Sequence, residues 1–284
     1  MVISRGVLLM LGASFLFSVM NLLVKFISHI PATEIILFRS VISLVLCLVI
    51  LKRKKIHIWG NNRKILILRG LSGATALITL FMLLQTIPLA SATVLHYLSP
   101  IFTAIVTFII LHEKLYKIQW LFFLMCFAGI LMIKGFDPRV STFDLLLGIF
   151  SAFCSALAYT CIRVMKNSEH PLVIVLYFPL VTLPIVTVFS LFNWVTPVGT
   201  DWIVLIGVGL LTQFAQTMMT QSYQAEEAAK VASINYFGII YALSFGLIFF
   251  NERFSFWVMI GIFLVISGVV LNVGFKRLFK VSAQ

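Results

Sequence analysis

The chain has 284 residues, of which 61% are hydrophobic and 11% are charged, and its mean hydropathy is +1.11. A soluble globular protein is nearer half apolar and a quarter charged, so the composition excludes that class and predicts an all-α integral membrane protein. The formal net charge is +12. The basic residues lie in short breaks between apolar runs, where they set membrane topology, so we expect no nucleic-acid partner.

Ten apolar runs are long enough to form membrane helices, because a bilayer core requires about 20 apolar residues per helix. Their approximate ranges are 6–27, 33–51, 65–86, 90–111, 116–134, 144–165, 171–192, 201–223, 229–250 and 255–275. Pro100 lies inside the fourth run, and Pro179 and Pro184 lie inside the seventh. A proline within a membrane helix frees backbone carbonyls, which neighbouring helices or water must satisfy.

Lysine and arginine are distributed unevenly between the predicted loops. With the N-terminus in the cytoplasm, most of them fall on the cytoplasmic side, and this assignment counts Arg69 among the cytoplasmic charges. The exceptions on the opposite side are Lys25, Lys134, Arg139 and Arg253, and Arg39 lies within the second helix. The positive-inside rule therefore predicts that both termini are cytoplasmic.

The stretch that starts at Leu89 recurs 139 positions later. The offset pairs Ala90 with Ala229, Tyr97 with Tyr236, Glu113 with Glu252 and Gly129 with Gly268. The first helices of the two halves also match, since Ser14 corresponds to Ser155 at an offset of 141. We therefore predict two repeats, residues 1–137 and 141–284. Each holds five helices, an odd number, so their topologies are inverted, which is a recurring plan of secondary transporters.

These motifs resemble the drug/metabolite transporter superfamily of the EamA type. The resemblance lies in Phe38-Arg39, Leu89-Ala-Ser-Ala-Thr, Ser99-Pro100-Ile101-Phe102 and Glu113-Lys114-Leu115. Arg69-Gly70 and the run from Ile87 to Val94 are similar to the G-type branch of solute carrier family 35. The resemblance covers essentially the whole chain. It implies ten helices in two EamA repeats, a central cavity and alternating access.

Polar side chains inside membrane helices are costly and usually face the bundle interior or a cavity. Ser14, Ser18, Asn21 and Lys25 share one face of the first helix, and Ser151, Ser155, Tyr159 and Arg163 share one face of the sixth. The serines can alternatively serve close packing, and other polar groups can form interhelical hydrogen bonds. The candidate substrate-binding residues are Asn21, Arg39, His96, Tyr97, Ser99, Tyr159, Arg163, Gln213, Gln216, Asn235 and Tyr236.

Arg39 has no carboxylate one helical turn away. It either extends to the outer interface, pairs with Glu34 or a carbonyl, or attracts an anionic or zwitterionic substrate. No acidic residue lies deep in a predicted helix, so a carboxylate proton relay is not expected, and His96 is the obvious titrating candidate. Glu113 and Glu252 are expected to fix the hairpin turns.

The sequence thus predicts a secondary-active or facilitative transporter of a small organic metabolite, of the amino-acid or organic-anion type, working by alternating access in export or exchange. The alternatives are a channel- or receptor-like protein on the same fold, or an integral membrane enzyme. Metalloprotease, P-loop and Gly-x-Ser-x-Gly motifs are absent from the sequence, so we expect no catalytic residues, metal or cofactor. The expected partners are the substrate and the lipid bilayer, for a monomer or homodimer in the bacterial inner membrane.

Overall fold

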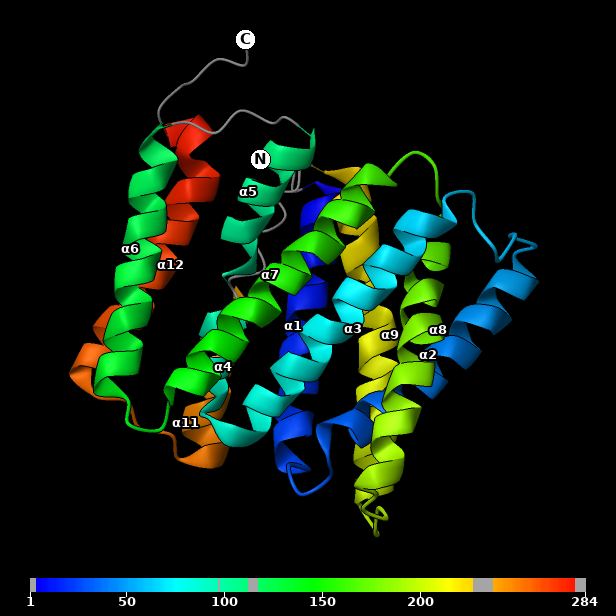
Figure 1. The fold of residues 1–284 in the computed structure, drawn as a ribbon, viewed down its shortest axis with the longest axis horizontal. Coiled ribbons are helices and arrows are strands. Elements are labelled where there is room, and N and C mark those ends of the chain that lie inside the picture. Colours follow the sequence, from blue (N-terminus) through cyan, green and yellow to red (C-terminus); the bar gives the residue numbers. More distant parts are fainter. Residues whose placement is uncertain (1–3, 97, 112–116, 227–236, 279–284) are drawn as a thin grey trace.

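The computed structural model describes residues 4–96, 98–111, 117–226 and 237–278, and within these ranges the regular structure is entirely helical (Figure 1). The helices are α1 (Arg5–Phe26), α2 (Ala32–Arg53), α3 (Arg63–Thr86), α4 (Leu89–His96), α5 (Ser99–Leu111), α6 (Lys117–Phe136), α7 (Thr142–Val164), α8 (Pro171–Phe192), α9 (Asp201–Ala225), α11 (Phe237–Phe250) and α12 (Phe256–Leu278).

Seven helical stretches are long and apolar enough to cross a membrane, and one of them, Leu89–Ile110, combines α4 and α5. Three shorter apolar helices are Trp120–Met132, Phe237–Phe250 and Phe256–Gly268. The observed helices begin and end within a few residues of most predicted ranges, apart from the ninth, whose first part lies outside the described residues.

The fourth predicted helix is divided, which corrects the expectation of one continuous helix with a proline inside it. The helix α4 ends at His96, and α5 begins at Ser99 with Pro100 in its first turn. Proline fits this position because it has no N–H to donate and its fixed φ suits a helix start. The Leu98 N–H bonds to the carbonyl oxygen of Leu95 at 3.2 Å and so closes the last turn of α4.

The helices form a bundle in which α1 packs on α9, α3 on α7 and α2 on α8. The α6–α12 pair packs together at the opposite side of the bundle from α2 and α8 (Figure 1). The start of α1 and the end of α12 lie at the upper end in this view, and the connections α6–α7 and α11–α12 lie at the lower end. The arrangement leaves the two halves of the chain interleaved around a common centre.

Two glycine contacts between α6 and α12 form a reciprocal pair. A Cβ atom at Gly129 would come 2.5 Å from the carbonyl oxygen of Gly261, and one at Gly268 would come 2.8 Å from that of Phe122. Gly129 and Gly268 are 139 positions apart, as are Phe122 and Gly261. Glycine allows the backbones of α6 and α12 to approach this closely. The contact is therefore repeated about an approximate two-fold axis between these helices.

A second reciprocal pair joins helices elsewhere in the bundle. A Cβ at Gly70 of α3 would lie 2.8 Å from Val181 Cγ2 of α8, and one at Gly209 of α9 would lie 2.5 Å from Ile42 Cδ1 of α2. These residues are again related by 139 positions. The related helices α6 and α12 run in opposite directions (Figure 1), so the approximate axis is perpendicular to the helices.

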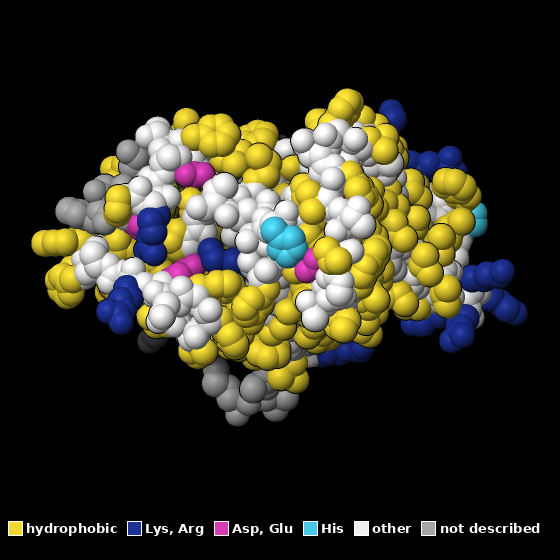
Figure 2. Space-filling model, turned by 90° about the horizontal axis from the view of Figure 1, so that it is seen from below, with side chains coloured by type: hydrophobic (Ala, Val, Ile, Leu, Met, Phe, Trp, Pro, Cys, Tyr) yellow, Lys and Arg dark blue, Asp and Glu magenta, His cyan; other side chains and the backbone are white. Residues whose placement is uncertain are grey.

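Large apolar side chains cover the outside of the bundle. Phe192 is 78% exposed and Ile248 is 72% exposed, and many other Phe, Leu, Ile and Val side chains are also exposed. Figure 2 shows the lower end, where hydrophobic side chains dominate and acidic and basic groups are interspersed over part of the face. So much exposed apolar surface is unfavourable in water, which agrees with an integral membrane protein.

Candidate substrate cavity

A pocket that is partly open to solvent lies among α1, α2, α3, α4, α7, α8 and α9. Both halves of the chain therefore contribute to its wall. The polar residues that line it are Asn21, Arg39, Arg69, Thr93, His96, Ser155, Tyr159 and Gln216. Apolar residues complete the wall, and none of the described lining residues is acidic. An apolar wall with a few converging polar groups is typical of sites for small organic molecules.

The structure brings together five of the residues predicted from sequence, which are Asn21, Arg39, His96, Tyr159 and Gln216. Ser99, Arg163 and Gln213 are described but do not line the cavity. Tyr97, Asn235 and Tyr236 lie outside the described residues. The side chains that share one helix face in the sequence therefore divide between the cavity and other neighbours.

Gln213 illustrates the alternative role of interhelical hydrogen bonding. The Ser43 hydroxyl of α2 donates to Gln213 Oε1 at 2.5 Å, and Gln213 Nε2 donates to the Cys47 sulfur at 3.1 Å. The amide thus joins α9 to α2. Ser99 is buried at the start of α5, and its carbonyl oxygen accepts a bond from the Thr103 hydroxyl at 2.7 Å. Arg163 is half-buried in the last turn of α7.

Arg39 is 1% exposed, and none of its three guanidinium nitrogens has a hydrogen-bond partner among the described residues. Its guanidinium carbon lies 5.1 Å from the centroid of the Phe178 ring and 5.8 Å from that of Phe81. Glu34 instead accepts a hydrogen bond from the Val195 N–H at 3.0 Å. Arg39 therefore neither reaches the interface nor pairs with Glu34, and it faces the cavity with aromatic neighbours.

Arg69 is the functional candidate that the sequence interpretation missed. Its assignment to the cytoplasmic charges is corrected by the structure, because α3 begins at Arg63 and the Arg69 side chain is only 2% exposed. Its Nη2 donates to Gln216 Oε1 at 3.4 Å, and its guanidinium carbon lies 5.6 Å from the Phe178 centroid. The signal available in the sequence was its position inside the apolar run that begins at Ile65, followed directly by Gly70.

Gly73 leaves the space that the Arg69 guanidinium occupies. A Cβ atom at Gly73 would collide with Arg69 Nη1 and would come 3.0 Å from a ring carbon of Phe178. One helical turn separates Gly73 from Arg69, so the missing side chain lets the guanidinium lie against the helix. The two arginines and Phe178 thus form one cluster, the arginine cluster, at the junction of α2, α3 and α8.

Tyr159 and His96 occupy other parts of the cavity wall. The Tyr159 ring stacks on Tyr223 with a centroid separation of 5.2 Å and an interplanar angle of 17°. His96 Nδ1 lies 3.5 Å from the Ser151 hydroxyl, which donates to the Ala76 carbonyl oxygen at 2.8 Å. These contacts connect α7 to α9, α4 and α3, and they hold both rings at the edge of the cavity.

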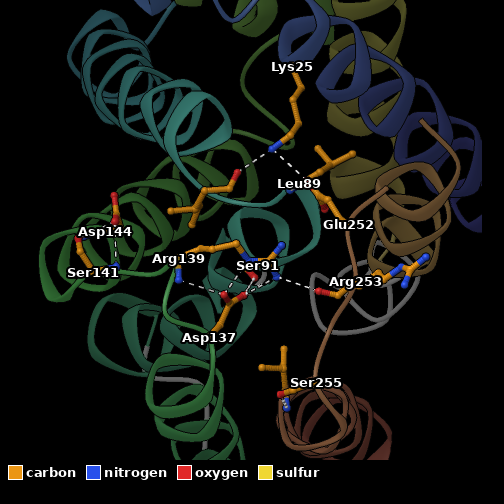
Figure 3. Close-up of polar contacts among 12 residues, drawn as sticks. Lys25, Leu89, Ser91, Asp137, Arg139, Ser141, Asp144, Glu252, Arg253 and Ser255 are labelled. Atoms are coloured by element: carbon orange, nitrogen blue, oxygen red, sulfur yellow. Dashed lines mark hydrogen bonds and ion pairs between the residues drawn. The ribbon is translucent and has the colours of Figure 1, made fainter. Parts of the chain in front are cut away.

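A network of polar contacts joins α1, α4 and the segment that precedes α12 (Figure 3). Glu252 is 6% exposed, and its carboxylate forms an ion pair with Lys25 Nζ at 3.1 Å. The carboxylate also accepts a hydrogen bond from the Leu89 N–H at 2.8 Å. Lys25 also donates to the Ile87 carbonyl oxygen at 2.7 Å. We call these four residues the lower network. Glu252 is expected from the sequence to fix a hairpin turn; in the structure its carboxylate joins the second half of the chain to α1 and α4.

A second ion pair lies beside the lower network. Arg139 donates to the Asp137 carboxylate at 2.8 and 3.0 Å, and the Ser91 hydroxyl lies 3.4 Å from the same group. Arg139 also donates to the Arg253 carbonyl oxygen at 3.2 Å (Figure 3). Hydrogen bonding to Asp137 holds the pKa of the Arg139 guanidinium above its ordinary value. The connection between the two halves is thereby tied to the α11–α12 connection.

Within the described part of the chain, no three His, Cys, Asp or Glu side chains come together as a metal site. The cavity instead offers hydrogen-bond donors, aromatic faces and positive charge. Such a surface can bind and orient a small ligand through hydrogen bonds, ring contacts and charge.

Residues 4–135 and 142–274 each match the EamA-like transporter family. The chain belongs to the EamA-like transporter family. Its EamA matches cover nearly all of the sequence and divide at the connection between α6 and α7. This agrees with the resemblance seen in the sequence motifs and with the reciprocal glycine contacts.

Several curated relatives of this EamA protein are transporters by name. The chain is 30% identical to the pseudopaline exporter CntI of Pseudomonas aeruginosa, over 88% of this chain and 89% of the relative. It is 31% identical to human solute carrier family 35 member G1, over 95% of this chain and 78% of the relative. A riboflavin transporter of Vibrio cholerae is 27% identical, over 80% of this chain and 78% of the relative.

The fold of this EamA protein is also found in a solved crystal structure, with a TM-score of 0.72 and 16% sequence identity over 97% of this chain and 98% of the other. At this identity the likeness concerns the fold alone. Together, the family match and the transporter relatives identify a membrane transport protein.

Proposed function

We propose that this protein is an alternating-access carrier that moves a small organic metabolite, of the amino-acid or organic-anion type, in export or exchange. The observation that carries the proposal is the polar cavity whose wall is built from helices of both repeats. A relative is named an exporter, which supports the outward direction. The proposal includes a bacterial inner membrane location, with both termini in the cytoplasm.

The proposal also includes ten membrane spans arranged as two inverted five-helix repeats, residues 1–137 and 141–284. The reciprocal contacts of Gly129 with α12 and Gly268 with α6 support it, because an approximate two-fold axis perpendicular to the helices relates halves of opposite topology. In such carriers one half rocks against the other about a central site.

The lower network supplies contacts that opening toward the exterior must break. Lys25 is one helical turn from the cavity residue Asn21 on α1, and Leu89 is one turn from the cavity residue Thr93 on α4. One turn is about 5.4 Å along a helix. The Lys25–Glu252 ion pair thus covers the cavity at the lower end, and this conformation is the one closed on that side.

Counterflow separates a carrier from a channel or receptor. Purified protein is screened by thermal shift for a stabilising metabolite and is then reconstituted into liposomes loaded with that metabolite. A carrier accumulates labelled substrate transiently against its gradient, with a rate that saturates. Labelled substrate that only equilibrates, without transient accumulation, would show a channel, and stabilisation without flux would show a receptor.

Thiol labelling tests the inverted topology. Single cysteines replace Lys117 at the start of α6 and Ser255 before α12, and intact cells are exposed to a membrane-impermeant thiol reagent. The four native cysteines are buried, so background labelling is low. We expect reaction at position 255 alone from the exterior, and reaction of position 117 only after the membrane is opened. Labelling of both positions from one side excludes inverted repeats.

A further inference from the structure

The arginine cluster carries two positive charges with no described acidic residue in the cavity wall. Arg39 and Arg69 are both almost completely buried, and both lie over the ring of Phe178. Five of their six guanidinium nitrogens lack a hydrogen-bond partner among the described residues, and the sixth contacts Gln216. Buried charges are normally paired, whereas both guanidinium groups of this cluster are buried without an ion-pair partner among the described residues.

Three buried acidic groups described in the bundle bond to other partners. Glu34 bonds to the Val195 N–H, Glu252 pairs with Lys25, and Asp137 pairs with Arg139. The aromatic ring of Phe178 offers a cation–π contact, which is weaker than an ion pair. An unpaired buried ion is strongly unfavourable, and a helix bundle retains one where a ligand supplies the missing charge.

The sign and number of the charges restrict the ligand. A cationic ligand would be repelled by both arginines. A zwitterionic amino acid brings no net charge, and a monocarboxylate leaves one guanidinium uncompensated. A ligand with two negative charges neutralises the cluster. Guanidinium groups are also the preferred partners of carboxylate and phosphate oxygens, since their planar donors match two acceptor oxygens at once.

We propose that the arginine cluster makes the cavity selective for a small organic dianion. This rests on the proposed transport function and names its substrate class. None of the Arg39 guanidinium nitrogens has a hydrogen-bond partner among the described residues, so they can donate to the oxygens of a carboxylate or phosphate. The guanidinium of Arg69 is positioned by its hydrogen bond to Gln216. The apolar wall beside them, which includes Phe17, Leu77 and Leu80, accommodates a short carbon skeleton.

Binding is measured by ligand-induced thermal shift on the purified full-length protein. The dianion probes are succinate, glutarate and glycerol phosphate, and the comparison probes are butyrate, alanine and choline. We expect stabilisation by dianions and little or none by the comparison probes. The two carboxylates and the phosphate ester distinguish which dianion chemistry fits, and stabilisation by either source supports the proposal.

The variants Arg39→Gln and Arg69→Gln test the residues. Each removes a charge-assisted partner and should raise the dissociation constant of the preferred dianion at least about tenfold. Each should also narrow the preference for succinate over butyrate, because one positive charge remains. The matched controls are Arg53→Gln on α2 and Arg63→Gln on α3, both exposed, and they should leave affinity unchanged.

The stability of the ligand-free variants separates binding from structure. If the arginines lack protein partners because a ligand pairs with them, replacing either one by glutamine removes an unpaired buried charge. The melting temperature without ligand should then stay the same or rise. The variants Arg39→Lys and Arg69→Lys retain the charge, so they should keep the selectivity for dianions with reduced affinity. A large fall in ligand-free stability for both glutamine variants would show that the arginines are structural and would overturn the proposal.

The proposed function and this inference fail in different ways. Saturable flux of a cation, zwitterion or monoanion that is insensitive to Arg39→Gln and Arg69→Gln would overturn the inference and leave the carrier intact. Dianion binding without flux in liposomes would overturn the carrier and leave the dianion site intact. Failure of every dianion probe to stabilise the wild-type protein overturns the inference directly.

Discussion

Glu252→Gln tests the lower network, because it removes one charge while retaining the size of the side chain. The glutamine oxygen can still accept the hydrogen bond from the Leu89 N–H, which is 2.8 Å from the carboxylate in the native protein. The lost interaction is the ion pair with Lys25, whose side chain is 15% exposed. The variant therefore isolates the charge of the network from its packing.

The magnitude follows from the partial burial of the pair. Breaking a buried ion pair by removing one partner costs about 3–5 kcal/mol. Lys25 keeps its hydrogen bond to the Ile87 carbonyl oxygen and some contact with solvent, so we expect about 2–3 kcal/mol. In the proposed alternating-access cycle the network forms only in the conformation closed at the lower end. The loss should therefore shift the ratio of open to closed protein by roughly 30- to 150-fold.

The assay is thiol labelling of a cavity cysteine from the exterior. Thr93→Cys places the reporter in the cavity, one turn from Leu89. Adding Glu252→Gln should raise the labelling rate of this cysteine by up to roughly 30- to 150-fold, the expected shift in the ratio of open to closed protein. Asp144→Asn is the control, because its carboxylate lies at the same end but caps its own helix through Ser141. An unchanged labelling rate in Glu252→Gln, or an equal increase in Asp144→Asn, would refute this role of the network.

Three further outcomes are expected. Gly129→Val should force α6 and α12 apart and destabilise the protein by about 1–3 kcal/mol. Its melting temperature should fall, whereas that of the exposed control Ala128→Val should not. Equal melting temperatures for the two variants would contradict the close contact. Gly73→Ala should displace the Arg69 guanidinium and weaken dianion binding. The melting temperature without ligand should stay the same or rise, because alanine favours a helix. An unchanged dianion affinity would contradict a role of the arginine cluster in binding. Transport should proceed without obligatory proton movement, and in an imposed pH gradient any strong coupling that persists in His96→Gln would contradict His96 as the titrating group.

The sequence by itself determined the class of protein, the positions of most helices and the duplication. These properties depend on local composition and on spacing along the chain, since a bilayer demands a run of apolar residues for each helix. The offset of 139 positions that pairs Gly129 with Gly268 is visible in the amino-acid sequence, and in the folded protein the two glycines make reciprocal contacts between α6 and α12. The motifs likewise pointed to the EamA family, which the match to both halves shows.

Helical periodicity identifies which residues share a face, but it does not identify the neighbour that each residue meets. The sequence makes Gln213 and Gln216 alike candidate substrate-binding residues, whereas the structure turns Gln213 toward Ser43 on α2 and Gln216 toward Arg69 on α3. Three residues advance a helix by about 300°, so neighbouring positions can face different helices. Hydrophobic spacing alone could not decide between a packing contact and a cavity.

The arginine cluster is the feature that only the tertiary structure decided. Arg69 lies close in sequence to the basic loop, which favours a topological role for its charge, whereas Arg39 is unusual in the sequence but has no neighbour that the sequence identifies. Gly70 lets α8 approach α3, and Gly73 makes room for the guanidinium, which brings both arginines against Phe178. Three helices from both repeats must pack before these groups meet, because the contacts are distant in sequence and depend on backbone approach rather than on local pattern.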